Sequence, residues 1–187
     1  MAKVILDLCG GTGAWSEPYK YQNEYSVLNV TLPEWDILKE NTVCCCISMD
    51  PYGILFAPPC TAWANSGVRW WKERSPDEIF KNAEILIKGL RIIYESCPMF
   101  WAIENPVGKM KRLLGEPTMI FNPCDYGDPY TKKTLLWGKF KVPHMRRVEP
   151  TEKSKMHSNY GGKSNKTKEM RSITPPGFAQ AFFKANR

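Results

Sequence analysis

The stretch Val4-Ile5-Leu6-Asp7-Leu8-Cys9-Gly10-Gly11-Thr12-Gly13 decides the fold prediction. Its first five residues form a short, mainly apolar run, which is typical of a parallel strand buried on both faces. The glycines that follow predict a tight turn into a helix, where backbone N–H groups can meet the polar groups of a ligand. Many α/β proteins have a glycine-rich first turn, so this motif alone identifies neither a ligand nor an activity.

Strand-like and helix-like segments alternate through the rest of the first 138 residues. The predicted strands after the first are residues 25–32, 54–57, 99–103 and 135–138. Residues 77–96 predict a helix, because their apolar side chains recur at helical spacing behind a favourable Pro-Asp start. A predicted last helix opens at Thr174-Pro175-Pro176, and the side chains expected on one side of it are Phe178, Ala181, Phe182 and Ala185. The alternation predicts an α/β fold with a single doubly wound, mostly parallel sheet, in which ligands gather at the carboxyl ends of the strands.

Residues 139–170 differ from the rest of the chain. Lys and Arg outnumber Glu there, Gly, Ser and Asn are interleaved, and apolar periodicity is absent. We interpret this segment as a basic, loop-rich insertion within a single domain that covers residues 1–187. The formal net charge of +7 suits a polyanionic partner such as nucleic acid, because neutralised phosphates release counterions. A basic surface can also be solvated without any partner.

The sequence argues against a membrane span and a metal site. Its apolar runs are far shorter than the roughly 20 residues that a span needs, and the N-terminus has no signal-peptide pattern. The seven cysteines include no Cys-x-x-Cys pair, and the only histidines are His144 and His157. The consecutive Cys44, Cys45 and Cys46 would alternate between the faces of a strand and could not form a tetrahedral cage. We therefore expect reduced thiols in a cytoplasmic protein.

A cysteine follows two prolines in Ala57-Pro58-Pro59-Cys60-Thr61. At the end of a predicted strand this cysteine would face the ligand crevice, where a thiolate can act as a nucleophile. Trp63, Arg69, Trp70 and Trp71 follow, and aromatic and cationic side chains suit stacking against an extruded base. Most single cysteines are instead small buried hydrophobes, and the motif alone leaves that alternative open.

Two further motifs place chemical groups beside predicted strands. In Trp101-Ala102-Ile103-Glu104-Asn105-Pro106 a carboxylate follows an apolar run, and low-dielectric surroundings would raise its pKa as a general acid requires. In Gly127-Asp128-Pro129-Tyr130-Thr131-Lys132-Lys133-Thr134 a turn delivers two lysines next to a strand. The ordinary alternatives are a helix cap or surface turn for the carboxylate and full solvation for the lysine pair.

The order of these motifs resembles the cytosine-5 DNA methyltransferase family. A glycine turn, Pro-Pro-Cys, Glu-Asn, and Asp-Tyr-Gly-x-Pro with basic residues follow one another over residues 3–138, and the resemblance extends to residues 171–186. The residues of the last two motifs are similar to those of short bacteriophage methylase proteins that lack a full target-recognition domain. The resemblance implies a Rossmann-like, class I S-adenosylmethionine-dependent methyltransferase fold and a DNA partner, double- or single-stranded.

The resemblance also implies roles for individual residues. The expected cofactor-binding residues are Asp7, Leu8, Cys9, Gly10, Gly11, Thr12 and Gly13 at the methionine end of S-adenosylmethionine, Asp36 at the adenine, and Trp15 and Pro58. Cys60 would be the nucleophile and Glu104 the acid, while Lys132 stands where the family has an arginine beside the substrate. The expected substrate-binding residues are Pro59, Arg69, Asn105 and Lys133.

The implied reaction is covalent. Attack of the Cys60 thiolate on carbon 6 of cytosine would break the aromaticity of the ring, and Glu104 would protonate or hydrogen-bond ring nitrogen 3 to stabilise the enamine. Carbon 5 could then take the methyl group, and loss of its proton would expel the cysteine. The target base must be extruded from a duplex or lie in a single strand.

Several positions depart from the family pattern. The acidic residue expected after the second strand, for the cofactor ribose, is absent from residues 29–32. Ala64 stands in place of a serine, and Tyr130 and Thr134 replace a glutamine and an arginine. The 139–170 segment is too short for a full target-recognition domain. These departures predict weak or short sequence specificity and weaker cofactor binding.

Two other functions stay open at this point. The same fold and residue pair could methylate RNA or free nucleotides. Alternatively, the chain could be a catalytically weak or inactive methylase-like DNA-binding protein with an anti-restriction role, which the missing ribose acid favours. The intact pair of Cys60 and Glu104 argues against that reading, because a binding scaffold needs neither residue.

Overall fold

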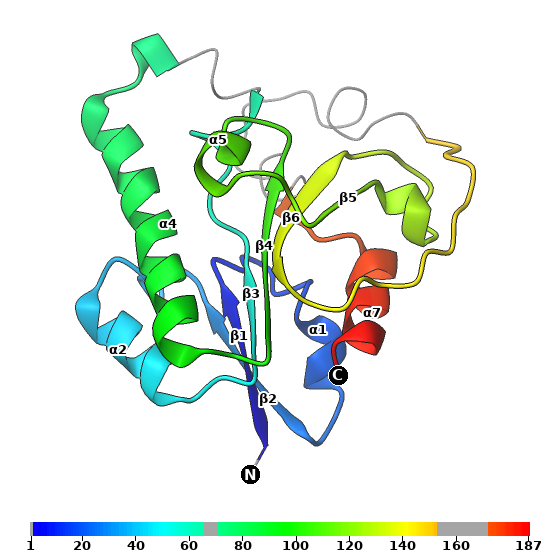
Figure 1. Ribbon diagram of the computed structural model, residues 1–187, viewed down its shortest axis with the longest axis horizontal. Coiled ribbons are helices and arrows are strands. Elements are labelled where there is room, and N and C mark those ends of the chain that lie inside the picture. Colours follow the sequence, from blue (N-terminus) through cyan, green and yellow to red (C-terminus); the bar gives the residue numbers. More distant parts are fainter. Residues whose placement is uncertain (1, 66–70, 153–171) are drawn as a thin grey trace.

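A central sheet organises the described part of the chain, which in this computed structural model comprises residues 2–65, 71–152 and 172–187. Its strands are β1 (Lys3–Leu8), β2 (Tyr25–Val30), β3 (Gly53–Phe56), β4 (Phe100–Pro106), β5 (Met119–Phe121) and β6 (Thr134–Lys139). They lie in the order β2-β1-β3-β4-β6-β5. The first four strands in this order are parallel to one another, whereas β6 runs antiparallel to both β4 and β5 (Figure 1). The prediction of a single, mostly parallel α/β sheet is confirmed.

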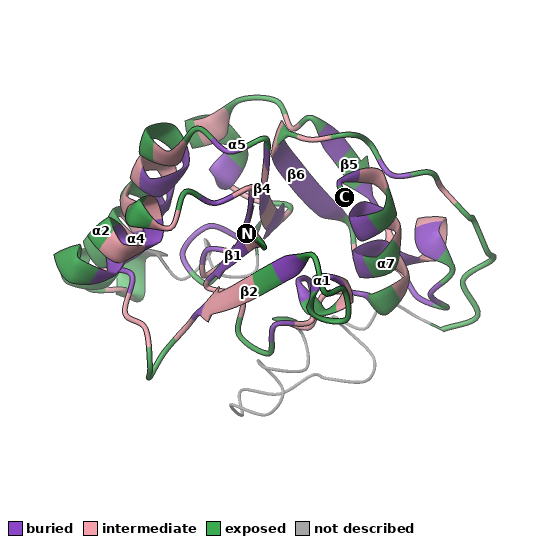
Figure 2. Ribbon diagram, turned by 90° about the horizontal axis from the view of Figure 1, so that it is seen from below, coloured by how far each residue is buried: buried purple, intermediate pink, exposed green. Residues whose placement is uncertain are grey.

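Helices cover both faces of the sheet. The helices are α1 (Glu17–Lys20), α2 (Glu40–Ser48), α4 (Pro76–Ser96), α5 (Met110–Leu114) and α7 (Pro176–Ala185), with short 3₁₀ turns at Trp71–Glu73 and Pro123–Tyr126. α2 and α4 lie on one side of the sheet and α1 and α7 on the other (Figure 2). None of the helices in the described ranges has the length and apolar character to cross a membrane.

Side chains of the central strands point alternately to the two helical layers. Leu6 and Ile54 belong to the core beneath α2 and α4. Their chain neighbours Ile5 and Leu55 belong to a second, aromatic core beneath α1 and α7. All four side chains are fully buried, as expected for central strands of a sheet covered on both faces.

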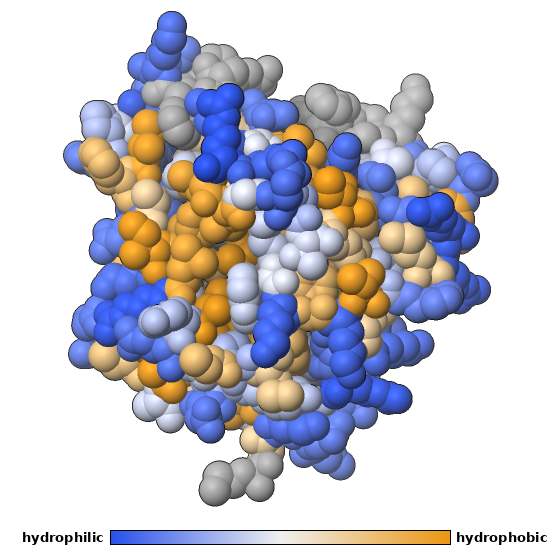
Figure 3. Space-filling model, viewed as in Figure 1, coloured by the Kyte–Doolittle hydropathy of each residue, from blue (hydrophilic) through white to orange (hydrophobic). Residues whose placement is uncertain are grey.

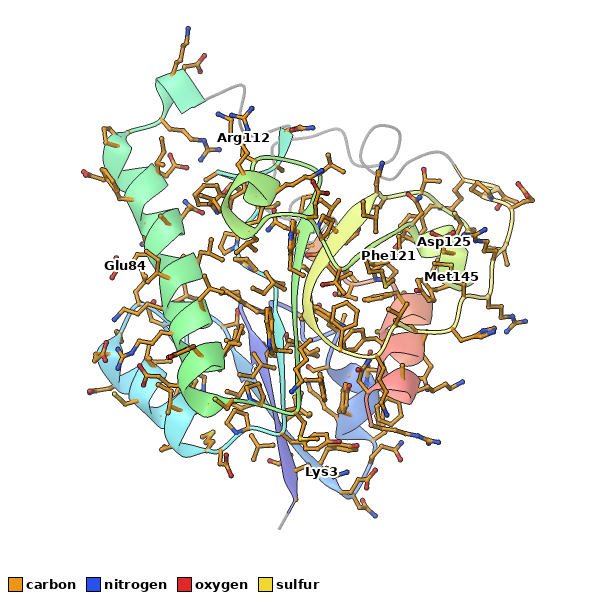
Figure 4. The ribbon with its side chains drawn as sticks, in the orientation of Figure 1. Lys3, Glu84, Arg112, Phe121, Asp125 and Met145 are labelled. Atoms are coloured by element: carbon orange, nitrogen blue, oxygen red, sulfur yellow. The ribbon has the colours of Figure 1, made fainter. Side chains whose placement is uncertain are left out.

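The last helix closes the aromatic core. Phe121, on β5, points toward α7 and stacks on Phe178 with 4.0 Å between ring centroids (Figure 4). Phe178 and Phe182 are fully buried, as predicted. Ala181 and Ala185 are only partly buried, and Ala179 and Phe183 complete the buried side instead. The apolar face is therefore rotated from the predicted one toward the aromatic rings.

The run of three cysteines lies in helix α2, so the interpretation of this run as a strand is wrong. Cys46 and Val43 are fully buried in the core, whereas Cys44 is exposed. Thr, Val and Cys are poor helix formers, which is why the sequence pattern did not predict a helix. Packing against α4, and ion pairs from Lys88 and Arg91 to Glu40 at the helix start, override the local preference.

Candidate functional site

The carboxyl ends of the parallel strands bring the predicted motifs to one edge of the sheet. Asp7 lies near the end of β1, the Cys60 loop follows β3, and Glu104 lies in β4. In Figure 1 this edge is at the top, opposite the N-terminus. Ligands of open α/β sheets bind at this edge.

A buried hydrogen-bond network holds the glycine turn after β1. The Ser16 hydroxyl lies 2.6 Å from Oδ2 of Asp7, to which it donates, and 3.2 Å from the carbonyl oxygen of Gly13. From the end of β2, Asn29 donates its Nδ2 to the carbonyl oxygen of Gly11 at 2.9 Å. Side chains from two strands and the following loop thus fix the turn in place.

The glycines of the turn serve different purposes. A Cβ at Gly10 would lie 2.4 Å from Oδ1 of Asp7 and 2.6 Å from Oδ1 of Asn29, so the missing side chain makes room for this internal network. Gly11 has a φ of +54° and open space around its Cβ position. Gly11 and Thr12 are exposed. The tip Gly11-Thr12 is therefore the part of the turn that a ligand can approach.

The same network leaves two buried oxygens without a hydrogen-bond partner among the described residues, Oδ1 of Asp7 and Oδ1 of Asn29. Burial raises the pKa of Asp7 to about 6, an effect that the hydrogen bond from Ser16 and the charge of Lys20 only partly oppose. A cationic ligand near the turn would offset the cost of burying this acid. The residues present therefore fit a cofactor that carries positive charge, as S-adenosylmethionine does.

A hollow of about 410 Å³ lies beside the turn. Its lining residues are Thr12, Gly13, Ala14, Glu17, Lys20 and Tyr21. The ammonium of Lys20 lies 3.0 Å from the Cβ position of Gly13. The hollow thus lies between the glycine turn and α1, with one positive group, Lys20, and one negative group, Glu17, on its wall.

The loop after β2 contributes two carboxylates to this edge. Asp36 accepts a hydrogen bond from the backbone N–H of Leu38 at 3.0 Å. Burial raises the pKa of the Cys9 thiol to about 12, and the negative charges of Asp7 and Asp36 add to that effect, so Asp36 lies within electrostatic reach of the glycine turn. Glu34 is exposed in the same loop. No sequence motif singles out Glu34, because it lies in the turn beyond residues 29–32, where the family pattern has its acid.

The loop that carries Cys60 is anchored on both neighbouring strands. The N–H of Ala57 donates to the carbonyl oxygen of Leu8 at 3.0 Å. Nδ2 of Asn105, a buried residue of β4, donates to the carbonyl oxygen of Pro58 at 3.0 Å. Cys60 itself is exposed. The Pro-Pro backbone and these two anchors hold an accessible thiol at the edge of the sheet.

A second contact joins the chain after Cys60 to the chain after Glu104. Ala64 and Gly108 form an isolated antiparallel bridge, and Lys109 donates its N–H to the carbonyl oxygen of Trp63 at 2.7 Å. A Cβ at Gly108 would lie 2.0 Å from that same oxygen, so the approach requires glycine. The two loops that carry the predicted nucleophile and acid are therefore fixed to each other.

Glu104 is partly buried where β4 meets β6. Burial raises the pKa of its carboxyl group, and the charge of Lys132 opposes this effect. Lys132 lies two residues before β6, whose Leu136 is the register partner of Glu104. The prediction that an apolar strand raises the pKa of Glu104 agrees with this arrangement.

The remaining predicted residues are placed less favourably. The side chain of Leu8 is fully buried, and Trp15 packs against Phe178 and Phe182 in the aromatic core. Leu8 can therefore offer only its backbone to a ligand, and a cofactor contact by the Trp15 ring stays a prediction. The predicted substrate residue Arg69 and most of the basic insertion, residues 153–170, lie outside the described residues.

Helix α5 adds basic residues that belong to none of the predicted motifs. Lys111 and Arg112 are exposed, and Arg112 projects at the upper edge of the molecule (Figure 4). Lys111 pairs with Glu116 at 2.7 Å. Lys133, a predicted substrate residue, is exposed before β6. Within the described ranges, His, Cys, Asp and Glu side chains form no group that could hold a metal ion.

Comparisons with known proteins point to methyltransferases. No family model matches the chain. Over 100 residues, which are 52% of this chain, it is 30% identical to the Type II methyltransferase M.SacI of Streptomyces achromogenes, and it spans about a quarter (25%) of that protein. A crystal structure from E. coli, described as a DNA modification methyltransferase encoded within a prophage, matches with a TM-score of 0.53 and 15% identity over 80% of this chain and 52% of that one. The chain thus shares its fold with a methyltransferase structure and has sequence similarity to part of a Type II methyltransferase.

Proposed function

We propose that this chain is an S-adenosylmethionine-dependent DNA cytosine-5 methyltransferase with Cys60 as nucleophile and Glu104 as acid. The observation that carries the proposal is the joining of the Pro58-Pro59-Cys60 loop to the Glu104-Asn105 strand by the hydrogen bond from Asn105 to Pro58. An exposed thiol and a carboxyl with a raised pKa thereby share one edge of the sheet with the glycine turn. The similarity to part of a Type II methyltransferase supports methyl transfer as the reaction.

In the proposed reaction, the Cys60 thiolate adds its electron pair to carbon 6 of an extruded cytosine. Glu104 in its neutral form donates a proton or a strong hydrogen bond to ring nitrogen 3, so the negative charge does not accumulate on the ring. Carbon 5 becomes an enamine nucleophile and accepts the methyl group, which S-adenosylmethionine supplies when bound. Water then takes the proton from carbon 5, the Cys60 sulfur leaves as a thiolate, and ring nitrogen 3 returns its proton to Glu104, which restores the aromatic ring and the neutral acid.

The cofactor would lie across the ends of β1 and β2. The tip Gly11-Thr12 would meet its methionine end, and the buried charge of Asp7 would be offset by the cofactor's cationic groups. Glu34 and Asp36, in the loop after β2, are the carboxylates available for the ribose and the adenine. Glu34 thus offers the acid that residues 29–32 lack.

Transfer of radiolabelled methyl groups to DNA, tRNA and dCMP in parallel tests the proposal. DNA should gain label at carbon 5 of cytosine, and DNA containing 5-fluorocytosine should trap a covalent adduct at Cys60 that mass spectrometry locates. Cys60→Ser should abolish both signals, whereas Cys97→Ser, at another exposed cysteine, should retain both. Label in tRNA alone would make RNA the substrate and overturn the DNA assignment.

A second candidate is a methylase-like DNA-binding protein without turnover. The observation that favours it is Asn29, an amide at the end of β2 whose side chain is committed to the carbonyl oxygen of Gly11. If the wild type binds DNA without transferring methyl groups, and Cys60→Ser binds DNA equally well, the result would support the binding protein over the enzyme.

A further inference from the structure

The outer face of α4 carries a row of large apolar side chains. Phe80, Ile87 and Tyr94 are 70%, 63% and 82% exposed. They are seven residues apart, so they lie within an arc of about 40° along a helix of 3.6 residues per turn. Figure 3 shows hydrophobic side chains over α4. Exposed apolar rows of this kind are typical of an interaction surface, because burying them releases ordered water.

This row is not needed to attach α4 to its own sheet. The side chains that α4 buries include Leu86, Ile92 and Ile93, on the opposite side of the helix. The helix also contacts α2 through ion pairs of Lys88 and Arg91. α4 is therefore fully anchored without Phe80, Ile87 and Tyr94.

Two opposite charges flank the row on one side. Glu84 and Arg91 follow Phe80 and Ile87 by four residues each, so they lie next to the row on the same flank of the helix. Glu84 points away from the sheet (Figure 4) and forms no salt bridge within the described ranges. Arg91 is oriented by Glu95, 2.7 Å away, and by Glu40.

The arrangement is self-complementary about Ile87. If two copies of α4 pack antiparallel with their Ile87 side chains at the centre, Phe80 of one copy meets Tyr94 of the other. Glu84 of each copy then lies beside Arg91 of the other, because residues on the same flank face each other in antiparallel helix pairs. In a parallel pair Glu84 would instead face the other flank of the row, which carries the apolar, partly buried Ala83 and Leu90 and offers no cation.

We propose that α4 is the interface of a homodimer in which two copies of this helix pack antiparallel across a two-fold axis at Ile87. The contact is isologous, so that it closes with two copies and does not propagate. Its apolar centre and charged flank match the composition of helix-pairing interfaces. The dimer depends on α4 alone and is independent of the proposed enzymatic function.

Sedimentation of the full chain over a wide range of concentrations tests the interface. The wild type should associate to a dimer, and Ile87→Glu should weaken dimerisation by about a hundredfold or more, as expected for a central buried side chain. The matched control is Ile120→Glu, at another exposed isoleucine on the far strand β5, and it should dimerise like the wild type. A monomeric wild type, or equal effects of the two variants, would overturn the proposal.

Two further variants test the antiparallel register. Glu84→Lys should weaken the dimer because it places two cations together, whereas Glu24→Lys, at an exposed site before β2, should not. Ile87→Cys should form a disulfide-linked dimer with its own copy under mild oxidation, at a higher yield than the wild type with its native exposed cysteines. A dimer that survives Ile87→Glu and gains no crosslink from Ile87→Cys would place the interface elsewhere.

Discussion

The side-chain amide of Asn105 donates a hydrogen bond of 3.0 Å to the carbonyl oxygen of Pro58, in a position closed to solvent. Pro58 precedes Cys60 by two residues, and Asn105 follows Glu104 directly. This contact, together with the bridge between Ala64 and Gly108, therefore sets the position of the Cys60 loop relative to the strand of Glu104. Proline supplies no backbone N–H, so the carbonyl oxygen of Pro58 is the group through which this residue can be held.

Asn105→Ala should lower methyl transfer by misplacing the Cys60 loop. Losing a buried hydrogen bond and leaving the Pro58 oxygen without its donor costs about 1–3 kcal/mol of stability. The matched control is Asn82→Ala, which also removes a buried amide, one that donates to the carbonyl oxygen of Glu78 at 2.7 Å on α4. Both variants should show a lower thermal midpoint, but only Asn105→Ala should show a reduced kcat at temperatures where the protein is folded. A kcat that falls equally in both would assign the effect to stability alone.

The proposed acid predicts the pH dependence of the reaction. Burial raises the pKa of Glu104 above its ordinary value, so the neutral form persists to higher pH than in water. Because the neutral form donates the proton, the limb of the kcat/KM profile that Glu104 sets should fall as pH rises through the raised pKa. Glu104→Gln cannot lose a proton, so its residual activity, lower by about 10²–10⁴-fold, should lack this limb of the profile. An identical limb in the Gln variant would assign the titration to another group.

The two neighbouring glycines of the turn should respond differently to alanine. Gly10→Ala inserts a methyl group 2.4 Å from the Asp7 carboxylate, and such overpacking should cost about 1–3 kcal/mol of unfolding free energy. In Gly11→Ala the new methyl group contacts no neighbour. The alanine must, however, adopt a φ of +54°, which costs about 1–2 kcal/mol of unfolding free energy. The exposed methyl group of Gly11→Ala should reduce the affinity of the protein for S-adenosylhomocysteine, which calorimetry measures. If Gly11→Ala lowered the free energy of unfolding as much as Gly10→Ala does but left the affinity for S-adenosylhomocysteine unchanged, the tip Gly11-Thr12 would not belong to the cofactor site.

The sheet was predictable because its strands carry strong local signals. The buried run of β1, the glycine turn and the periodic apolar pattern of α4 are each encoded by adjacent residues. α2 was not predictable, because Val43 and Cys46 become helical through packing under α4 and their own propensity is low. The short strand β5 likewise depends on pairing with β6, which joins it as a neighbour in the sheet.

The residues of the candidate site also include some that could be predicted from the sequence and some that could not. Cys60, Glu104 and the glycine turn were found because each belongs to a recognisable motif at a strand end. Asn29 and Gly108 were missed, since one acts by reaching the carbonyl oxygen of Gly11 and the other by admitting the backbone of Trp63. Contacts between loops that are distant in the chain leave no pattern in the sequence of either loop.

Helix α5 should contribute to DNA binding through Arg112. This exposed guanidinium lies at the same edge as the Cys60 and Glu104 loops, because α5 follows β4 after a short turn (Figure 4). Arg112→Ala should weaken DNA binding and reduce the slope of log affinity against log salt by about 1, the value for one lost phosphate contact. The matched control is Arg187→Ala, which removes an exposed arginine beside Tyr52 and Phe100 at the opposite edge of the sheet and should leave the slope unchanged. Fluorescence anisotropy with a labelled duplex at several salt concentrations measures both slopes. Equal slopes in the wild type and Arg112→Ala would exclude Arg112 from the DNA contact, whereas a shallower slope in both variants would indicate a general effect of net charge.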